Sequence, residues 1–339
     1  MPTRVEFRFN RPQEYNPQPG KIELERDTTA TPPGLNVPSC RGYTKPMNQT
    51  TRQSTGIAAL DEHLGGGLLP GTLTVLAGAT GIGKTQLGLA FLQTGQQQEG
   101  HRGIVFDMSS RGDSQNHGPY ASSRYGWQLR PMAADESIVP EDVWRIDGEL
   151  GDYLNVFQQA GRRVTRQDLD FDQWLDWKAD LTKRLATAIF FFYGNFIRGV
   201  RRAVIDGMEP VDRPAESIQF ELFEYIYHQI LRKESDWVAR DLLRERFRAN
   251  QAEVDRHAYD FRQIGCLLLS TTRETMLEDL IGRPLDEGDV LSNANTVIYL
   301  GRVREGNRLA RAMYIAKHRG SACSEEIIPF EIGNEGVRV

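Results

Sequence analysis

The chain has 339 residues, a formal net charge of -5 and an isoelectric point near 5.8. This charge balance counts against a general affinity for nucleic acid or anionic membranes, because both attract positive charge. Cys40, Cys266 and Cys323 are isolated, so they predict neither a disulfide framework nor a zinc site and fit a reducing cytoplasm. No apolar stretch approaches membrane-spanning length and the N-terminus lacks a signal-peptide pattern, so we expect a cytoplasmic protein with no membrane contact.

Residues 1–52 form an N-terminal extension that is rich in Pro, Thr, Asn and Arg. Only Val5 to Phe9 alternates like a strand. The extension could be disordered, or its short strand could add to the sheet edge of a neighbouring subunit. Both interpretations stay open, and in either case the extension lies outside the core, which we assign to residues 53–339.

A phosphate-binding loop of the Walker A type follows an apolar, strand-like run. Residues Gly78 to Thr85 read Gly-Ala-Thr-Gly-Ile-Gly-Lys-Thr, and the run before them is Leu73 to Ala77. A loop wrapped around a triphosphate points successive backbone N–H groups inward, which small residues permit without a Cβ clash. The predicted nucleotide-binding residues are Gly78, Ala79, Thr80, Gly81, Ile82, Gly83, Lys84, Thr85 and Gln86.

Two side chains of this loop have separate roles in the predicted site. Lys84 reaches the β- and γ-phosphates as a point charge, which makes it a candidate catalytic residue, and the Thr85 hydroxyl is a ligand for Mg²⁺. A helix that begins near Thr85 directs its positive end at the phosphates. The expected ligands are therefore a nucleoside triphosphate and magnesium.

The sequence after Thr55 has the pattern of a compact α/β fold. Strand-like runs alternate mostly with helical stretches, which predicts a largely parallel sheet covered on both faces. The runs are Leu73 to Ala77, Gly103 to Met108, Ala203 to Asp206, Cys266 to Thr271 and Thr296 to Leu300.

Two stretches exceed what a minimal nucleotide-binding fold requires. The first lies near 111–170, and the second, near 232–256, mixes acidic and basic residues in a strongly helical composition. A balanced charge run of this kind is typical of a solvated helix face, and the alternative is a projection that docks a protein partner. Phe171, Trp174 and Trp177 are spaced as a core-facing helical stripe.

A magnesium-binding carboxylate is expected at the C-terminal end of a buried strand, and Asp206 ends the apolar run 202–206. The guanine-recognition element Asn-Lys-x-Asp follows the magnesium aspartate in switch GTPases. The nearest match here, Trp177 to Asp180, precedes Asp206 and lacks the Asn. ATP is therefore the expected nucleotide.

Several segments resemble the RecA superfamily, in particular the branch that contains the circadian clock ATPase KaiC. They occur in the order of that branch and cover roughly residues 55–339, apart from the two longer stretches. The segments are Thr55 to Asp61, Gly65 to Gly71, Tyr125 to Trp127, Arg201 to Gly207, Gln263 to Thr272, and Lys317 to Ser321 leading to Phe330. The resemblance implies a single RecA-like α/β domain, and 296–303 and 309–317 are expected to form an antiparallel pair around Glu305 to Asn307.

In the family, ATP lies between adjacent subunits of a ring or filament, and a basic pair from the neighbour reaches the γ-phosphate. Lys317 and Arg319 match that pair, so the resemblance implies a homo-oligomer, such as a hexamer, in which both residues act catalytically in trans. Their i, i+2 spacing places both side chains on one strand face, with His318 opposite. Without the resemblance, two solvated strand residues would be the simpler interpretation.

One departure from the family concerns the catalytic glutamate. The family carries it just after the strand that corresponds to 104–108, where this chain has Ser109 and Ser110. A serine hydroxyl is a far weaker proton acceptor than a carboxylate, so we expect slow hydrolysis. Asp107, on the same strand face as Ser109, is the candidate replacement, and Glu209 and Asp113 have no motif support.

Three functions remain open at this stage. The first is a KaiC-like oligomeric ATPase whose nucleotide state regulates assembly or partner binding. The second is a recombinase-like DNA-binding ATPase, against which the sequence 273–290 carries six acidic and two basic residues. The third is a nucleotide-dependent scaffold with almost no catalysis, which contacts protein partners through its longer stretches and its N-terminal extension.

Overall fold

The computed structural model divides the chain into residues 1–46 and 47–339, and the described residues all belong to the second unit. It describes residues 51–109, 117–132, 138–146, 150–157, 170–210, 217–283, 290–333 and 335–339, without the side chains of 171, 173–182, 218 and 290. Most of the N-terminal extension, Ser110 and Asp113 therefore lie outside the described residues.

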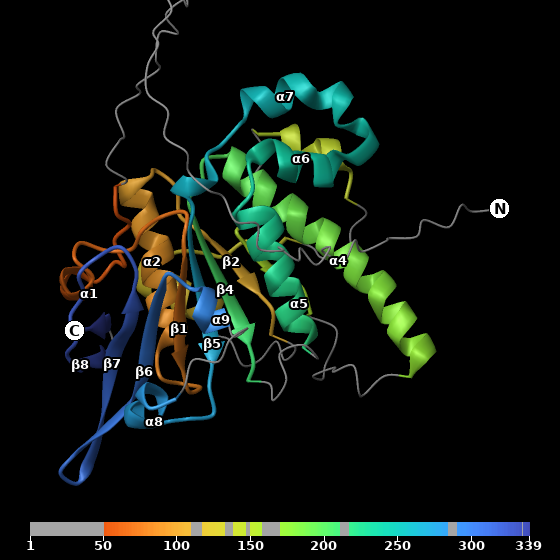
Figure 1. Cartoon of the computed structure of the whole chain (residues 1–339). Helices are drawn as coiled ribbons and strands as arrows, with labels where there is room; N and C mark the ends of the chain where they lie inside the picture. The colour runs from red at the N-terminus through yellow and green to blue at the C-terminus, as the bar shows by residue number, and fades with distance from the viewer. Residues whose placement is uncertain are drawn as a thin grey trace, which may run out of the picture. The chain divides into compact units, whose positions relative to one another are not determined.

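A nine-stranded sheet organises the second unit (Figure 1). Its order is β3-β2-β4-β5-β1-β6-β7-β8-β9, with parallel pairing from β3 to β6 and antiparallel pairing from β6 to β9. The predicted α/β fold, a mostly parallel sheet with a C-terminal antiparallel extension, is confirmed. The strands are β1 Leu73–Gly78, β2 Ile104–Asp107, β3 Tyr153–Asn155, β4 Arg202–Met208, β5 Gly265–Thr271, β6 Thr296–Glu305, β7 Arg308–His318, β8 Ile328–Gly333 and β9 Gly336–Arg338.

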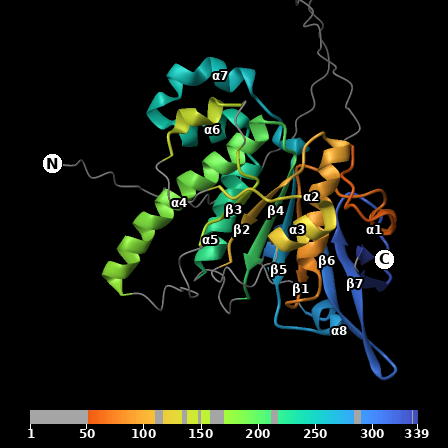
Figure 2. The same cartoon turned by 180° about the vertical axis from the view of Figure 1, so that it is seen from behind.

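Helices cover both faces of the parallel part of the sheet (Figures 1 and 2). The helices α1 to α3 supply apolar residues to one buried cluster, and α4 to α6 supply them to the other. The helices are α1 Ala58–His63, α2 Lys84–Gln98, α3 His117–Tyr125, α4 Phe171–Ile197, α5 Ile218–Tyr225, a π-helix Ile226–Leu231, α6 Ser235–Leu243, α7 Gln251–Arg256, α8 Leu277–Ile281 and α9 Val290–Asn293.

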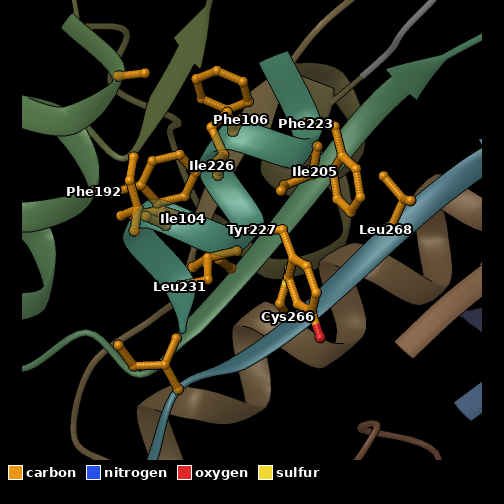
Figure 3. Close-up of a cluster of buried hydrophobic side chains, with 14 of the residues drawn as sticks. Ile104, Phe106, Phe192, Ile205, Phe223, Ile226, Tyr227, Leu231, Cys266 and Leu268 are labelled. Atoms are coloured by element: carbon orange, nitrogen blue, oxygen red, sulfur yellow. The ribbon is translucent and has the colours of Figure 1, made fainter. Parts of the chain in front are cut away.

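The buried strands divide their side chains between these two clusters. On β4, Ala203 and Ile205 belong to the cluster under α4 and α5, whereas Val204 belongs to the cluster under α2. Figure 3 shows part of the cluster under α4 and α5, where Ile205 lies near Phe223 and Ile226 of the α5 and π-helix segment. Because alternate strand residues point to opposite faces, Asp206 must project on the α2 side.

The first longer stretch contributes to the sheet as well as to helices. It contains β3, which pairs with β2 at the sheet edge, and a 3₁₀ turn at Pro140–Trp144. No strand was predicted from the sequence in this stretch. A strand of three residues, Tyr153 to Asn155, is too short to stand out as an apolar run.

The second longer stretch is helical, with α6, α7 and two intervening 3₁₀ turns. Its charged side chains Arg240, Arg244 and Glu245 are exposed, as expected for a solvated face. The predicted stripe of Phe171, Trp174 and Trp177 lies on α4, but these side chains are outside the description. Among the helices of the described ranges, none combines the length and the apolar character that a bilayer crossing requires.

Candidate nucleotide-binding site

The phosphate loop joins β1 to α2, as the sequence predicts. Gly81 and Gly83 have φ values of +76° and +120°, a region that glycine adopts without the strain of a side chain. A Cβ on Gly83 would also approach the Ile332 side chain to 2.7 Å. Thr80 and Gly81 are exposed at the tip, whereas Ile82 is buried. The loop therefore keeps its open backbone where an anion would have access.

Lys84 is the first residue of α2 and is only 7% exposed. Its Nζ donates to the carbonyl oxygens of Gly78 (2.7 Å) and Ala79 (3.0 Å), so without ligand the cation is bound to its own loop. Burial lowers the pKa of Lys84 to about 8, although the charge of Asp206 partly offsets this. A phosphate group would supply the negative charge that this buried ammonium lacks.

Thr85 and Asp206 meet at the base of the loop. The Thr85 Oγ1 donates a hydrogen bond of 3.1 Å to Asp206 Oδ2, and Asp206 Oδ1 accepts the Gly207 N–H at 2.6 Å. Asp206 is 1% exposed. A hydroxyl and a carboxylate are oxygen ligands of the kind that Mg²⁺ prefers, and the ion usually takes its remaining ligands from phosphates and water. These two residues therefore fit the predicted magnesium site.

The described ranges contain no group of three or more His, Cys, Asp or Glu side chains that could hold a metal ion by themselves. A magnesium ion at Thr85 and Asp206 would therefore depend on the oxygens of the nucleotide. The Gln86 side chain, also predicted at this site, has a buried amide oxygen with no hydrogen-bond partner among the described residues.

Asp107 of β2 pairs with Asp206 of β4 in the parallel sheet. The residue before each aspartate packs into the cluster under α4, so both aspartates point to the opposite face, toward α2. The Asp107 carboxylate is held by three donors: the Ser109 N–H (2.8 Å), the Tyr153 hydroxyl (2.7 Å) and the Asn155 amide (3.0 Å). It is 1% exposed. Burial, and then the charge of Asp107, raise the pKa of Tyr153, which keeps the phenol protonated as a donor.

His117, the first residue of α3, lies between the two aspartates. Its Nε2 is 2.9 Å from Asp206 Oδ2, its Nδ1 is 3.9 Å from Asp107 Oδ2, and the residue is 2% exposed. Burial alone would lower the pKa of His117, but the hydrogen bond to Asp206 and the charges of both aspartates outweigh it, so that the pKa is raised. Asp107, Asp206 and His117 thus form one buried cluster.

Ser109, which stands where the family carries its glutamate, is 2% exposed, and its hydroxyl has no hydrogen-bond partner among the described residues. The adjacent backbone is crowded, because a Cβ on Gly207 would overlap the Ser109 backbone nitrogen. Gly207 has a φ of +88° and lies in an irregularity of β4 between Ile205 and Met208.

Lys317 pairs with Val297 near the start of β6, and Arg319 follows β7, so both lie toward the opposite end of the sheet from the phosphate loop, which follows β1. Lys317 Nζ donates to the carbonyl oxygens of Leu291 (3.2 Å) and Ser292 (2.7 Å), and Arg319 reaches the same Ser292 oxygen at 3.5 Å. His318 is buried between them and bonds to Thr296. Burial, and then the charge of Arg319, lower the pKa of Lys317. The two basic side chains share one location.

Sequence reasoning did not find His117, Tyr153 or Asn155 as parts of the site. All three come from the first longer stretch, where only Tyr125 to Trp127 resembles the family, and the fold brings them to Asp107 and Asp206. A buried strand next to β2 would have been the one signal, and β3 is too short to provide it.

Comparisons with known proteins find similarity to KaiC ATPases. Residues 53–151, which include the phosphate loop, match the family model of the KaiC ATPase. Over these residues the chain is similar to a KaiC-like ATPase domain. The family-model match ends before Asp206, so it does not bear on the predicted magnesium role of that residue.

Individual KaiC proteins cover different lengths of the chain. The circadian clock protein KaiC2 of Synechocystis is 34% identical over 92 residues, which are 26% of this chain and 15% of that protein. The circadian clock oscillator protein KaiC of Parasynechococcus marenigrum is 24% identical over 307 residues, 90% of this chain and 47% of that protein. The chain thus spans less than half the length of these relatives.

A solved structure of a KaiC-like protein from Pyrococcus horikoshii superposes with a TM-score of 0.45 at 18% identity, covering 85% of this chain and 97% of that one.

Proposed function

We propose that this KaiC-like chain binds ATP with Mg²⁺ at the phosphate loop, hydrolyses it slowly, and forms a cytoplasmic homo-oligomer whose nucleotide state regulates assembly or partner binding. The observation that carries the proposal is the convergence of Lys84 and Thr85, at the start of α2, with Asp206 of β4. A buried ammonium, a hydroxyl and a carboxylate at one loop match the needs of a magnesium-bound triphosphate.

The residues of this chain divide the work of phosphoryl transfer among them. Gly81 and Gly83 leave the backbone N–H groups free to face phosphate oxygens, and Lys84 would exchange its two loop carbonyls for the β- and γ-phosphates. Thr85 and Asp206 would hold Mg²⁺, which neutralises charge that develops on the transferred group. Binding and charge neutralisation are the parts of catalysis that this site retains.

Activation of water is the part for which the site is poorly equipped. Asp107 already accepts hydrogen bonds from three groups and is almost fully buried, so little of its carboxylate is open to a water molecule. Ser109 offers only a hydroxyl. Slow turnover is therefore a better match to these contacts than efficient hydrolysis.

A nucleotide held between subunits would explain the location of Lys317 and Arg319. Both side chains donate hydrogen bonds to the Ser292 carbonyl oxygen. The strand that carries Lys317, β7, is four strands from β4 in the sheet order. A pair of cations that neutralise no carboxylate of the described residues is suited to a phosphate from outside the subunit. We therefore propose that they reach the γ-phosphate of a neighbouring subunit in a ring, such as a hexamer, or in a filament.

A nucleotide-dependent scaffold with almost no hydrolysis is the second candidate. The buried, hydrogen-bonded carboxylate of Asp107 favours it, and so does Trp237 of α6, which is 60% exposed in the second longer stretch and could contact a protein partner. DNA binding is less favoured, because Glu274, Glu278 and Asp279 accompany α8 after β5.

Sizing of the purified protein with ATP, with ADP and with neither, combined with phosphate release over a range of protein concentrations, separates these functions. The ATPase should assemble with ATP and release phosphate slowly, at a rate per chain that rises with assembly. The scaffold should assemble without release. Rapid release that persists in Asp107→Ala would contradict slow turnover, and an ATP-dependent, salt-sensitive shift of DNA would restore the recombinase alternative.

A further inference from the structure

His117 makes its only side-chain hydrogen bond in the described part of the chain to the magnesium aspartate. The Nε2 atom lies 2.9 Å from Asp206 Oδ2. Because an ionised carboxylate can only accept, Nε2 carries the proton and donates. The ring therefore occupies an acceptor position on the oxygen that also binds the Thr85 hydroxyl.

The acceptor capacity of Asp206 is nearly exhausted by these contacts. A carboxylate oxygen has two lone pairs, and those of Oδ2 are taken by Thr85 and His117, while Oδ1 takes the Gly207 N–H. Asp206 is 1% exposed, so solvent offers no other direction of approach. Magnesium, or a water molecule bound to it, that approaches Oδ2 displaces one of these two donors, and because Thr85 is itself a predicted magnesium ligand, that donor is His117.

The other ring nitrogen shows that this histidine is not simply a satisfied core residue. His117 Nδ1 is buried without a hydrogen-bond partner among the described residues, and its separation of 3.9 Å from Asp107 Oδ2 is too long for a hydrogen bond. Buried polar atoms normally find partners, so an orphan in this position indicates that the ring is placed by its contact with Asp206.

We propose that His117 competes with Mg²⁺ for Asp206, so that loading of the magnesium nucleotide must first break the His117–Asp206 hydrogen bond. The inference rests on the proposed function of the site. His117 is then a positioning residue: it acts on the nucleotide through Asp206 and sets how strongly nucleotide binding depends on magnesium. The same donor holds the carboxylate in place when no metal is present.

The test measures ATP affinity by calorimetry on the full chain, once with Mg²⁺ and once with EDTA. Three variants are compared with the wild type: His117→Ala, which removes the donor; His117→Gln, whose Nε2 amide can replace it; and His101→Ala, a control. His101 is exposed and precedes β2, whereas Asp107 is the last residue of that strand. Thermal melting monitors whether each variant folds.

Loss of a hydrogen bond to a charged group should tighten magnesium-dependent binding about tenfold in His117→Ala. Binding in EDTA should not change, and His117→Gln and His101→Ala should resemble the wild type. An equal change with Mg²⁺ and with EDTA would indicate a structural role and overturn the proposal. Unchanged or weaker binding with Mg²⁺ would overturn it too.

A second measurement needs no variant that removes the ring. The imidazole ¹⁵N resonances of His117 in the wild type should shift when ATP and Mg²⁺ are added together, and much less with ATP and EDTA. Identical spectra in both conditions would overturn the competition. If the wild type binds no ATP in either condition, the proposed function fails; if it binds ATP and only the His117 effects are missing, the further inference fails alone.

Discussion

Thr85 donates a hydrogen bond of 3.1 Å to Asp206 across 121 residues of sequence. The two residues follow from different strands, β1 and β4, and β5 lies between those strands in the sheet. The contact therefore depends on the whole parallel sheet and not on a local turn. It places the two predicted magnesium ligands side by side.

Removal of the Asp206 carboxylate should weaken binding of ATP with magnesium and spare binding without it. We expect Asp206→Ala to lose roughly 10- to 100-fold in affinity when Mg²⁺ is present, the range typical for groups that hold a metal or its ligands. Calorimetric titrations with Mg²⁺ and with EDTA measure both values. An equal loss in EDTA would mean that Asp206 supports the loop itself and not the ion.

The basic pair can be tested by mixing two inactive variants. Lys84→Ala should not bind ATP, and Lys317→Ala combined with Arg319→Ala should bind ATP but release little phosphate. If the pair acts in trans, a mixture should recover part of the wild-type rate, because intact loops then face intact pairs. Arg304→Ala, an exposed arginine of the same hairpin, is the control. A mixture no more active than its components would refute the trans role.

Gly207 and Gly306 allow the cost of a close contact to be separated from the cost of a positive φ angle. Both have positive φ, +88° and +60°, but a Cβ on Gly207 would overlap the Ser109 nitrogen, whereas a Cβ on Gly306 meets nothing within 4 Å. We expect Gly306→Ala to cost about 1 kcal/mol and Gly207→Ala about 3 kcal/mol or more of unfolding free energy. Urea denaturation measures the difference, and equal costs would contradict the close approach.

The thiol of Cys266 should be unreactive in the folded protein. It is 3% exposed on β5, and burial raises its pKa from 9.0 to about 12. Cys323 is partly exposed, so it should react first with a thiol reagent. The variant Cys40→Ser combined with Cys323→Ser isolates Cys266, and fast labelling of it without denaturant would show that β5 is accessible.

The raised pKa of Cys266 also predicts a loss of folding stability at high pH. Because the folded state retains the Cys266 proton more tightly than the unfolded state, the contribution of this thiol is complete below about pH 9 and disappears as the pH rises toward 12. A Cys266→Ala variant should show a smaller decline in unfolding free energy over that interval.

The sequence predicted the fold most accurately where a motif and a strand coincide. The glycine pattern of the phosphate loop follows β1 directly, and the single carboxylate at Asp206 lies within β4, so both positions could be inferred from local chemistry. The antiparallel hairpin of β6 and β7 was also predicted, because the turn at Gly306 separates two long strand-like runs.

The surroundings of the aspartates could not be predicted in the same way. Tyr153 and Asn155 reach Asp107 only because β3 joins the edge of the sheet, and strand order is a property of the folded chain. His117 has no motif, and a lone histidine in a polar stretch carries no signal of its position. The sequence therefore did not reveal the tertiary contacts, that is, which segments become neighbours of the two carboxylates.

The central claim is that a nucleotide binds at the loop through Lys84, and titration of ATP into the protein with Mg²⁺ tests it most directly. Lys84 lies buried on the Gly78 and Ala79 carbonyl oxygens, ready to exchange them for phosphate. We predict saturable ATP binding to the wild type and a loss of at least about 100-fold in Lys84→Ala, because a charged partner of the phosphates is removed. The absence of ATP binding to the wild type, or equal affinity of folded Lys84→Ala, would contradict the claim.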